Sequence, residues 1–153
     1  MERMRIRAFQ PADEHAIVAL WRECGLTRPW NDPHKDIARK RTEQPELFLV
    51  GTLGDEIVAS AMVGFDGHRG WVYYLAVAER HRKHSYGRAL MQEAERLLIE
   101  RGCPKLNLQV RSTNPGVIEF YRKLGYVQDE TVSLGKRLIP DQTKDAQSAQ
   151  EGR

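Results

Sequence analysis

The sequence predicts a mixed α/β domain built on one central sheet, and three observations indicate this class. Short apolar or alternating segments typical of strands occur at residues 5–9, 47–53, 57–65 and 71–77. Short polar turns join the last three segments, which is typical of antiparallel neighbours. From residue 86 onward, helical periodicity alternates with strand-like segments, which is typical of helix crossovers. The predicted sheet is therefore antiparallel at first and crossed by helices in its second half.

Size and composition fit one globular domain. The 153 residues are 41% hydrophobic and 29% charged, with a formal net charge of +3. We expect a single domain over residues 1–139 and a disordered tail over 140–153, because the tail has no apolar periodicity. Cys24 and Cys103 are far apart and predict neither a disulfide framework nor a zinc ribbon. No signal-peptide core or membrane-spanning run occurs, so we expect a cytoplasmic protein with no membrane partner.

In the first half of the chain, a strand over 5–9 precedes a helix from about Pro11 to Cys24. Its apolar residues fall on one stripe, at i, i+3, i+4 and i+7: Ile17, Leu20, Trp21 and Cys24. Proline suits the first turn of a helix, and Gly25 is expected to end this one. The stripe predicts a helix that buries one face.

A second, short helix is expected from Pro33 to Gln44. Its apolar anchors are Ile37 and Ala38, and the rest of the segment is basic and acidic. Such a helix is expected to pack loosely and to act as a movable rim over a site.

The middle strands form a meander followed by a long helix. Gly54 and Asp55 provide the chemistry of the first turn, and the sequence DGHRG at 66–70 provides the second. The long helix is expected from Tyr86 to Arg101, with a left-handed glycine cap directly after it.

The last part of the domain is expected to hold a strand at 105–110, a short helix at 114–124 and one or two closing strands over 126–138. The short helix carries four aligned apolar residues: Val117, Phe120, Tyr121 and Leu124.

The turn between the strand at 71–77 and the long helix is strongly basic. It contains Arg80, Arg82, Lys83 and Arg88, and no acidic residue lies between Glu79 and Glu93. A helix that begins there points unpaired N–H groups and the positive end of its dipole beyond the strand, which favours an anion. We therefore expect a phosphate-bearing ligand, with Gly87 allowing close approach and Ser85 offering a hydroxyl. A solvated basic turn is the plainer alternative.

Other phosphate and metal motifs are not indicated. The chain has no GxxxxGK[ST] segment and no GxGxxG after a strand, so neither a P-loop nor a dinucleotide site is predicted. His81 and His84 have HxxH spacing, but they lack a carboxylate or cysteine companion, so no metal is expected.

Two segments resemble the GNAT superfamily of N-acetyltransferases. The turn Arg82-Lys83-His84-Ser85-Tyr86-Gly87 matches two of the three signature positions in [Q/R]-x-x-G-x-[G/A], with Ser85 where glycine is usual. The segment NPGVIEFYRKLGYV is similar to that superfamily's Asn-x-x-[A/V]-x-x-[F/L]-Tyr-x-[K/R]-x-Gly-[F/Y] element. The segments RPWNDP, RGCPK and SLGKRL further resemble the bacterial YpeA-type subgroup. The resemblance implies a mostly antiparallel sheet of six to seven strands with about four helices.

The resemblance also implies a reaction and a site. Acetyl-CoA would be the co-substrate and a primary amine would attack it directly, in a ternary complex. The pantetheine arm would pair with the fourth strand, the diphosphate would rest on the basic turn, and Asn114 would contact the arm. Tyr121 would protonate the departing thiolate, since a phenol with a pKa of about 10 is protonated at neutral pH. The implied cofactor-binding residues are Leu75, Ala76, Val77, Arg82, Lys83, His84, Ser85, Tyr86, Gly87, Arg88, Asn114 and Tyr121.

The acceptor and its base are left open by the sequence. Five residues are candidates for the base: Glu23, Asp66, His68, Tyr73 and Tyr74. The segment 26–44 and the DGHRG turn are expected to shape the acceptor pocket, whether the amine belongs to a small molecule or a protein. The oligomeric state is open, a homodimer included.

Two alternatives to an acetyltransferase remain. The first is an acyl-CoA or phospho-ligand binding module of the same fold with little turnover, which Ser85 and the missing base would fit. The second is nucleic-acid binding, which the small net charge and the lack of exposed aromatic residues among the cations disfavour. We therefore expect no nucleic-acid partner.

Overall fold

The computed structural model describes residues 3–141. Over these residues there are four α-helices: α1 (Glu14–Glu23), α2 (Pro33–Lys40), α3 (Tyr86–Glu100) and α4 (Pro115–Lys123). Five strands are present: β1 (Arg5–Ala8), β2 (Phe48–Leu53), β3 (Glu56–Phe65), β4 (Gly70–Val77) and β5 (Leu106–Asn107). In this part of the chain, no helix has the length and apolar character needed to cross a membrane.

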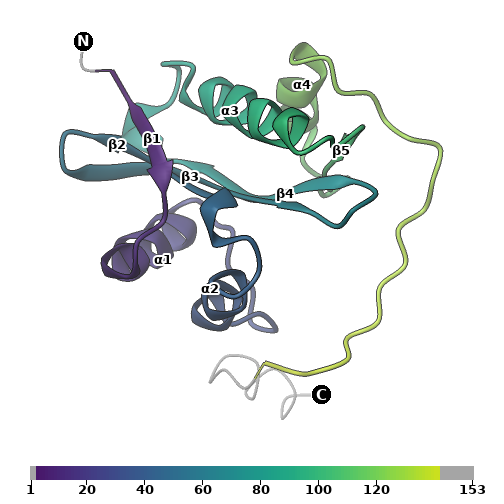
Figure 1. The fold of residues 1–153 in the computed structure, drawn as a ribbon, viewed down its shortest axis with the longest axis horizontal. Helices are drawn as coiled ribbons and strands as arrows, with labels where there is room; N and C mark the ends of the chain where they lie inside the picture. Colours follow the sequence, from purple (N-terminus) through teal and green to yellow (C-terminus); the bar gives the residue numbers. More distant parts are fainter. Residues whose placement is uncertain (1–2, 142–153) are drawn as a thin grey trace.

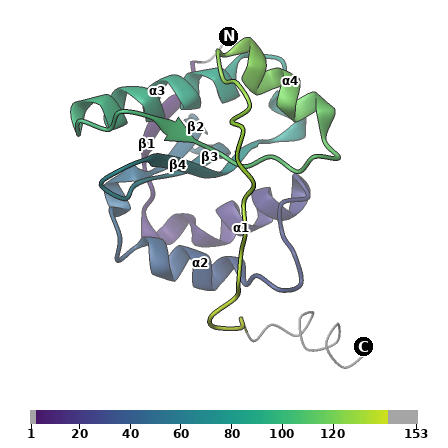
Figure 2. The ribbon, with the colours of Figure 1, turned by 90° about the vertical axis from the view of Figure 1, so that its right-hand side faces the viewer.

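The strands form one sheet in the order β1-β2-β3-β4-β5. The first four are antiparallel neighbours, and β5 is parallel to β4, as a helix crossover requires. Helices α1 and α2 cover one face, whereas α3 and α4 cover the other (Figures 1 and 2). The mixed, mostly antiparallel fold expected from the sequence is confirmed.

The expected number of six to seven strands is wrong, because the described chain has five. Residues 126–138 form no strand. They reach β5 and the second residue after it through side chains, with Asn107 Nδ2 2.8 Å from Asp129 Oδ2 and Gln109 Nε2 2.6 Å from Ser133 Oγ. A strand needs a neighbouring backbone ladder, and these side-chain bonds provide none. We call residues 125–141 the strap, because they cross from α4 to α2 in an extended course (Figure 2).

The core lies between the sheet and α1 on one side and between the sheet and α3 on the other. Trp21 and Phe48 are its largest fully buried side chains. The Trp21 indole lies 3.7 Å from the Tyr74 ring between centroids, and its Nε1 donates a hydrogen bond to Ser60 Oγ at 2.9 Å. The stripe expected on α1 is therefore buried, with its polar group satisfied.

Helix α2 differs from the expected loose rim. It ends at Lys40 rather than at Gln44, and Ala38 is exposed. Ile37 is fully buried, and Tyr74 Oη on β4 donates to Asp36 Oδ2 at 2.6 Å. Polar side chains therefore fasten α2 to the sheet, which an apolar pattern does not reveal.

The expected tail is only partly described. Asp141 is 4% exposed and bonds to α2. This residue of the expected tail therefore packs against α2. Residues 142–153 lie outside the described residues.

Candidate active site

Strands β4 and β5 separate soon after they meet. Their pairing is restricted to Gly70 with Leu106 and Trp71 with Asn107. Beyond it, Tyr74 has a left-handed backbone, with φ of 53°, and the β3–β4 register shifts between Ser60 and Met62. Such a bulge bends a strand and increases its twist. The remainder of β4 therefore has no strand on its β5 side in the described structure.

Two of the three predicted β4 residues present their backbone to that open side. Ala78 N donates to Val58 O at 2.8 Å, and Ala76 pairs with Ser60. Backbone groups alternate along a strand, so the N–H and C=O of Val77, which lies opposite Ala59, point away from β3, and those of its neighbour Leu75 should do the same, whereas those of Ala76 face Ser60. Leu75 and Val77 are the residues of this trio that could pair with a ligand.

The carbonyl of Val77 already has two donors. Arg82 Nε donates to it at 3.2 Å and Cys24 Sγ at 3.4 Å. Arg82 Nη2 is also 3.7 Å from Cys24 Sγ, and burial is the main cause that raises the pKa of the Cys24 thiol. The Arg82 guanidinium thus lies against the end of β4 and ties it to α1.

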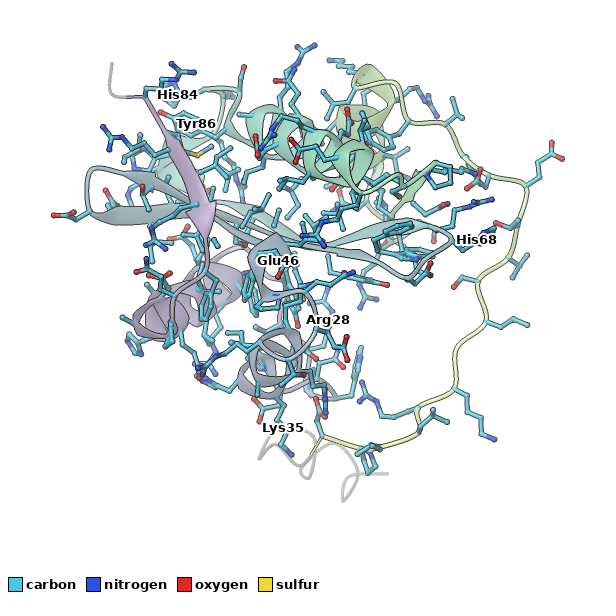
Figure 3. The ribbon with its side chains drawn as sticks, in the orientation of Figure 1. Arg28, Lys35, Glu46, His68, His84 and Tyr86 are labelled. Atoms are coloured by element: carbon cyan, nitrogen blue, oxygen red, sulfur yellow. The ribbon has the colours of Figure 1, made fainter. Side chains whose placement is uncertain are left out.

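The basic turn has the conformation that its sequence motif requires. Ser85, at the position where the motif usually has glycine, has φ of 62°, and Lys83 has φ of 69°. Glycine adopts such values without strain, whereas other residues lose roughly 1–2 kcal/mol. Helix α3 begins at Tyr86, and its first turn contains no acidic residue. Its first amides have no acceptor within the helix. The helix begins at the end of β4 opposite the DGHRG turn, as the positions of Tyr86 and His68 show (Figure 3).

Replacing Ser85 by glycine is expected to raise the free energy of unfolding by about 0.5–1 kcal/mol, because glycine removes the left-handed strain. Thermal or urea unfolding measures this. Ala19→Gly is the matched control, since Ala19 lies on the exposed side of helix α1 and should lose about 1 kcal/mol. A loss of stability in Ser85→Gly would contradict the left-handed turn.

Gly87 has a packing role. A side chain there would place its Cβ 3.2 Å from Phe120 Cζ and 3.8 Å from Val77 Cγ2. The glycine therefore lets the start of α3 approach α4 and the end of β4 closely.

Tyr121 and Asn114 both belong to α4. Tyr121 is 9% exposed, and its ring meets Phe120 and Tyr126 edge to face. Burial raises its pKa to about 12, so the phenol is protonated at neutral pH. Within residues 3–141 its hydroxyl has no hydrogen-bond partner. Asn114 caps the helix, with Oδ1 accepting from Val117 N at 3.4 Å.

Tyr74 and Tyr73 do not have the properties of a base. The Tyr74 hydroxyl donates to Asp36, and burial together with this bond raises its pKa far above the ordinary value. Tyr73 is half exposed and stacks with Trp71, and burial raises its pKa as well. Both phenols are therefore protonated at neutral pH.

The other candidate bases are engaged in local structure. Glu23 Oε2 accepts from Glu79 N at 3.1 Å. Asp66 accepts from His68 N at 2.8 Å and Arg69 N at 2.7 Å, and these bonds lower its pKa. His68 lies at the exposed tip of the β3–β4 turn (Figure 3).

An open hollow of about 430 Å³ lies at the other end of β4 from the basic turn. Its lining comes from the turn before β4, from β4, from β5 and the residue before it, and from the strap. The lining residues are Arg69, Trp71, Lys105, Asn107, Asp129, Glu130 and Thr131. Arg69 belongs to the DGHRG turn, as expected for an acceptor pocket, but the lining contains nothing from 26–44. The strap residues were not predicted from the sequence, because their acidic and polar composition is typical of any surface segment. In the described part of the chain, no group of three or more His, Cys, Asp or Glu side chains could hold a metal ion.

Comparison with known families decides the assignment. The Acetyltransferase (GNAT) family matches residues 14–126. The chain belongs to the GNAT acetyltransferase family. This GNAT protein is 51% identical over 139 residues to an acetyltransferase of Yersinia enterocolitica, covering 91% of this chain and 99% of the relative. It is 50% identical over 140 residues to an acetyltransferase of Sodalis glossinidius, with the same coverage.

Solved structures agree with the family assignment. Ard1 from Thermoplasma volcanium has a TM-score of 0.73 and 29% identity, covering 81% of this GNAT protein and 82% of that chain. The ribosomal-protein-S18-alanine N-acetyltransferase of Escherichia coli has a TM-score of 0.67 and 22% identity, covering 80% and 77%. The latter likeness concerns the fold alone.

Proposed function

We propose that this GNAT protein is an acetyl-CoA-dependent N-acetyltransferase in which a primary amine attacks the thioester directly. The observation that supports this most is the open side of β4 between the basic turn and the hollow. There, the pantetheine arm would pair with the backbone of Leu75 and with the amide of Val77, as a further strand would. The Val77 carbonyl already accepts from Arg82 and Cys24. Ala76 lies between Leu75 and Val77 and would hold β4 to β3.

The diphosphate of the coenzyme would rest on the start of α3. The amides of Tyr86, Gly87 and Arg88 have no acceptor within the helix, so they can donate to phosphate oxygens. Lys83, His84 and Ser85 lie on the same exposed turn and would add charge and a hydroxyl. Arg82 would contribute from its position against the Val77 carbonyl.

Tyr121 would act as the general acid. The amine nitrogen forms a bond to the thioester carbon, the carbon–sulfur bond breaks, and the Tyr121 hydroxyl gives its proton to the sulfur. Burial raises the pKa of the phenol, so at neutral pH its proton is present and can be given to the departing thiolate. The excess proton of the amine passes to solvent, and solvent returns a proton to the Tyr121 phenolate. Asn114 Nδ2 would donate to the pantetheine arm.

The acceptor is an amine that would approach from the hollow beside Trp71. A molecule seated there would lie on the opposite side of the acetyl group from the coenzyme nucleotide, so both substrates could be bound together. Release of free thiol from acetyl-CoA, measured with a panel of primary amines, tests the proposal. Turnover with at least one amine is expected, whereas acetyl-CoA binding without turnover on any amine would favour a binding module.

Replacing Arg82 and Arg88 together by alanine is expected to weaken acetyl-CoA about 10- to 100-fold, since hydrogen bonds to charged groups contribute about 1.5–3 kcal/mol. Calorimetry with acetyl-CoA and with acetyl-pantetheine measures this, and acetyl-CoA should weaken more, because Arg82 also donates to the Val77 carbonyl of β4. Arg96→Ala on α3 is the matched control, because Arg96 pairs with Glu93 and Glu100 on the exposed side. Equal weakening of both ligands would contradict a diphosphate site.

A further inference from the structure

The strap ends in a carboxylate that is buried against α2. The Asp141 side chain is 0% exposed. Its Oδ2 accepts from Asp32 N at 2.8 Å, and its Oδ1 accepts from Arg39 Nη2 at 2.6 Å. Arg137 Nη1 lies 3.9 Å from the same oxygen, and the Arg39 bond is the main cause that lowers the pKa of Asp141. We call Asp141 and its partner Arg39 the latch, because this ion pair fastens the end of the strap to α2.

Further hydrogen bonds connect the latch to Tyr74 on β4. Arg39 uses its other terminal nitrogen to donate to Asp36 Oδ1 at 3.1 Å. The second oxygen of Asp36 accepts from Tyr74 Oη at 2.6 Å. Arg39 thus bridges two carboxylates, one from the strap and one that holds Tyr74, as the planar fork of a guanidinium allows.

Tyr74 is also held at its backbone. Ser60 Oγ donates to Tyr74 O at 2.8 Å and accepts from Trp21 Nε1. Together with the phenol bond to Asp36, these contacts fasten both ends of the residue. A left-handed conformation in a tyrosine costs roughly 1–2 kcal/mol and persists where neighbouring groups hold it. The bonds around Tyr74 can supply that restraint.

We propose that Asp141, Arg39 and Asp36 are positioning residues that hold the Tyr74 bulge, and through it the open side of β4 where the acetyl group is transferred. This inference rests on the proposed function. The bulge immediately precedes Leu75, so a change at Tyr74 would re-aim the backbone groups that should face pantetheine. The strap also provides Asp129, Glu130 and Thr131 to the hollow, where Lys105 and Asn107 donate hydrogen bonds to Asp129.

The first test measures hydrogen exchange of the backbone amides over 72–78 in the ligand-free, full-length protein. Asp141→Asn keeps the size of the side chain but removes its charge, and we expect exchange at least about tenfold faster than in the unmodified protein. Arg39→Lys keeps the positive charge but removes the fork, so it should give the same result. Glu100→Gln is the matched control, because it weakens an exposed carboxylate–arginine pair on α3. Unchanged exchange in both variants would overturn the latch.

The second test is a double-mutant cycle on acetyl transfer. Asp141→Asn and Tyr74→Phe should each lower kcat about tenfold with little change in the KM of acetyl-CoA. The kcat of the double variant should be no lower than that of the less active single variant. Effects that multiply would overturn the connection through Tyr74. Exchange needs no substrate, so absence of acetyl transfer in the unmodified protein would contradict the proposed function and leave the exchange result to decide the latch.

Discussion

Replacing Tyr121 by phenylalanine is expected to lower kcat by about 10²–10⁴-fold, the range that general acid catalysis typically contributes. The change removes one oxygen from a buried ring that packs edge to face on Phe120 and Tyr126, so the apolar contacts remain. The hydroxyl has no hydrogen-bond partner within residues 3–141, so its loss leaves no described group unpaired. Affinity for acetyl-CoA, measured by calorimetry, should therefore change little.

Tyr126→Phe is the matched control for this prediction. Tyr126 is the neighbouring half-buried phenol, and its hydroxyl donates to Glu95 Oε2 at 2.5 Å. Its loss should lower stability by about 1 kcal/mol and leave kcat nearly unchanged. In the unmodified protein, Tyr121 should stay protonated at every pH below 10, because its pKa is raised to about 12. Its titration should therefore cause no loss of kcat in that pH range. Equal losses of kcat and of acetyl-CoA affinity in Tyr121→Phe would refute the role of acid.

Replacing Trp21 by alanine is expected to lower the free energy of unfolding by about 3–5 kcal/mol. Trp21 is fully buried, stacks on Tyr74 and Phe48, and donates to Ser60. The change removes these contacts and leaves a cavity between α1 and the sheet. Urea unfolding followed by circular dichroism measures the loss, and Tyr74 should become more mobile because its ring loses its neighbour.

Trp30→Ala provides the control for the size of the substitution. Trp30 is 47% exposed, so its replacement should change stability by much less than that of Trp21. Ser60→Ala separates the polar part of the effect. It removes the bonds to Trp21 and Tyr74 and should cost about 1–3 kcal/mol, because it leaves buried polar groups unpaired. Similar losses at Trp21 and Trp30 would contradict the packing described here.

Local patterns were sufficient for much of the fold. The stripe of Ile17, Leu20 and Trp21 predicted the buried face of α1, and Gly102 marked the end of α3, where it has φ of 76°. Helix periodicity and turn chemistry act over a few residues, so they can be read from the sequence. The closing strands could not be predicted in the same way, because a strand forms only where another backbone pairs with it.

In the candidate site, too, local motifs were predicted from the sequence and contacts between distant elements were not. The motif from Arg82 to Gly87 indicated the turn, and the structure gives Ser85 the backbone that glycine would have. The bulge at Tyr74 and the position of Arg82 on the Val77 carbonyl were not predicted. Both depend on groups from other elements, Ser60 and Cys24 among them, which have no fixed spacing from the residues they hold.

By itself the sequence determined the class of the domain, the basic turn before α3 and the α4 segment that carries Tyr121, because each depends on neighbouring residues. Only the tertiary structure decided where β4 opens, which backbone groups face that opening and how Asp141 reaches Tyr74. The bonds of Asp141 to Arg39 and Asp32 join residues 102 and 109 positions apart. Such contacts form when the folded chain brings distant charges together and removes them from water, and no local pattern records that event.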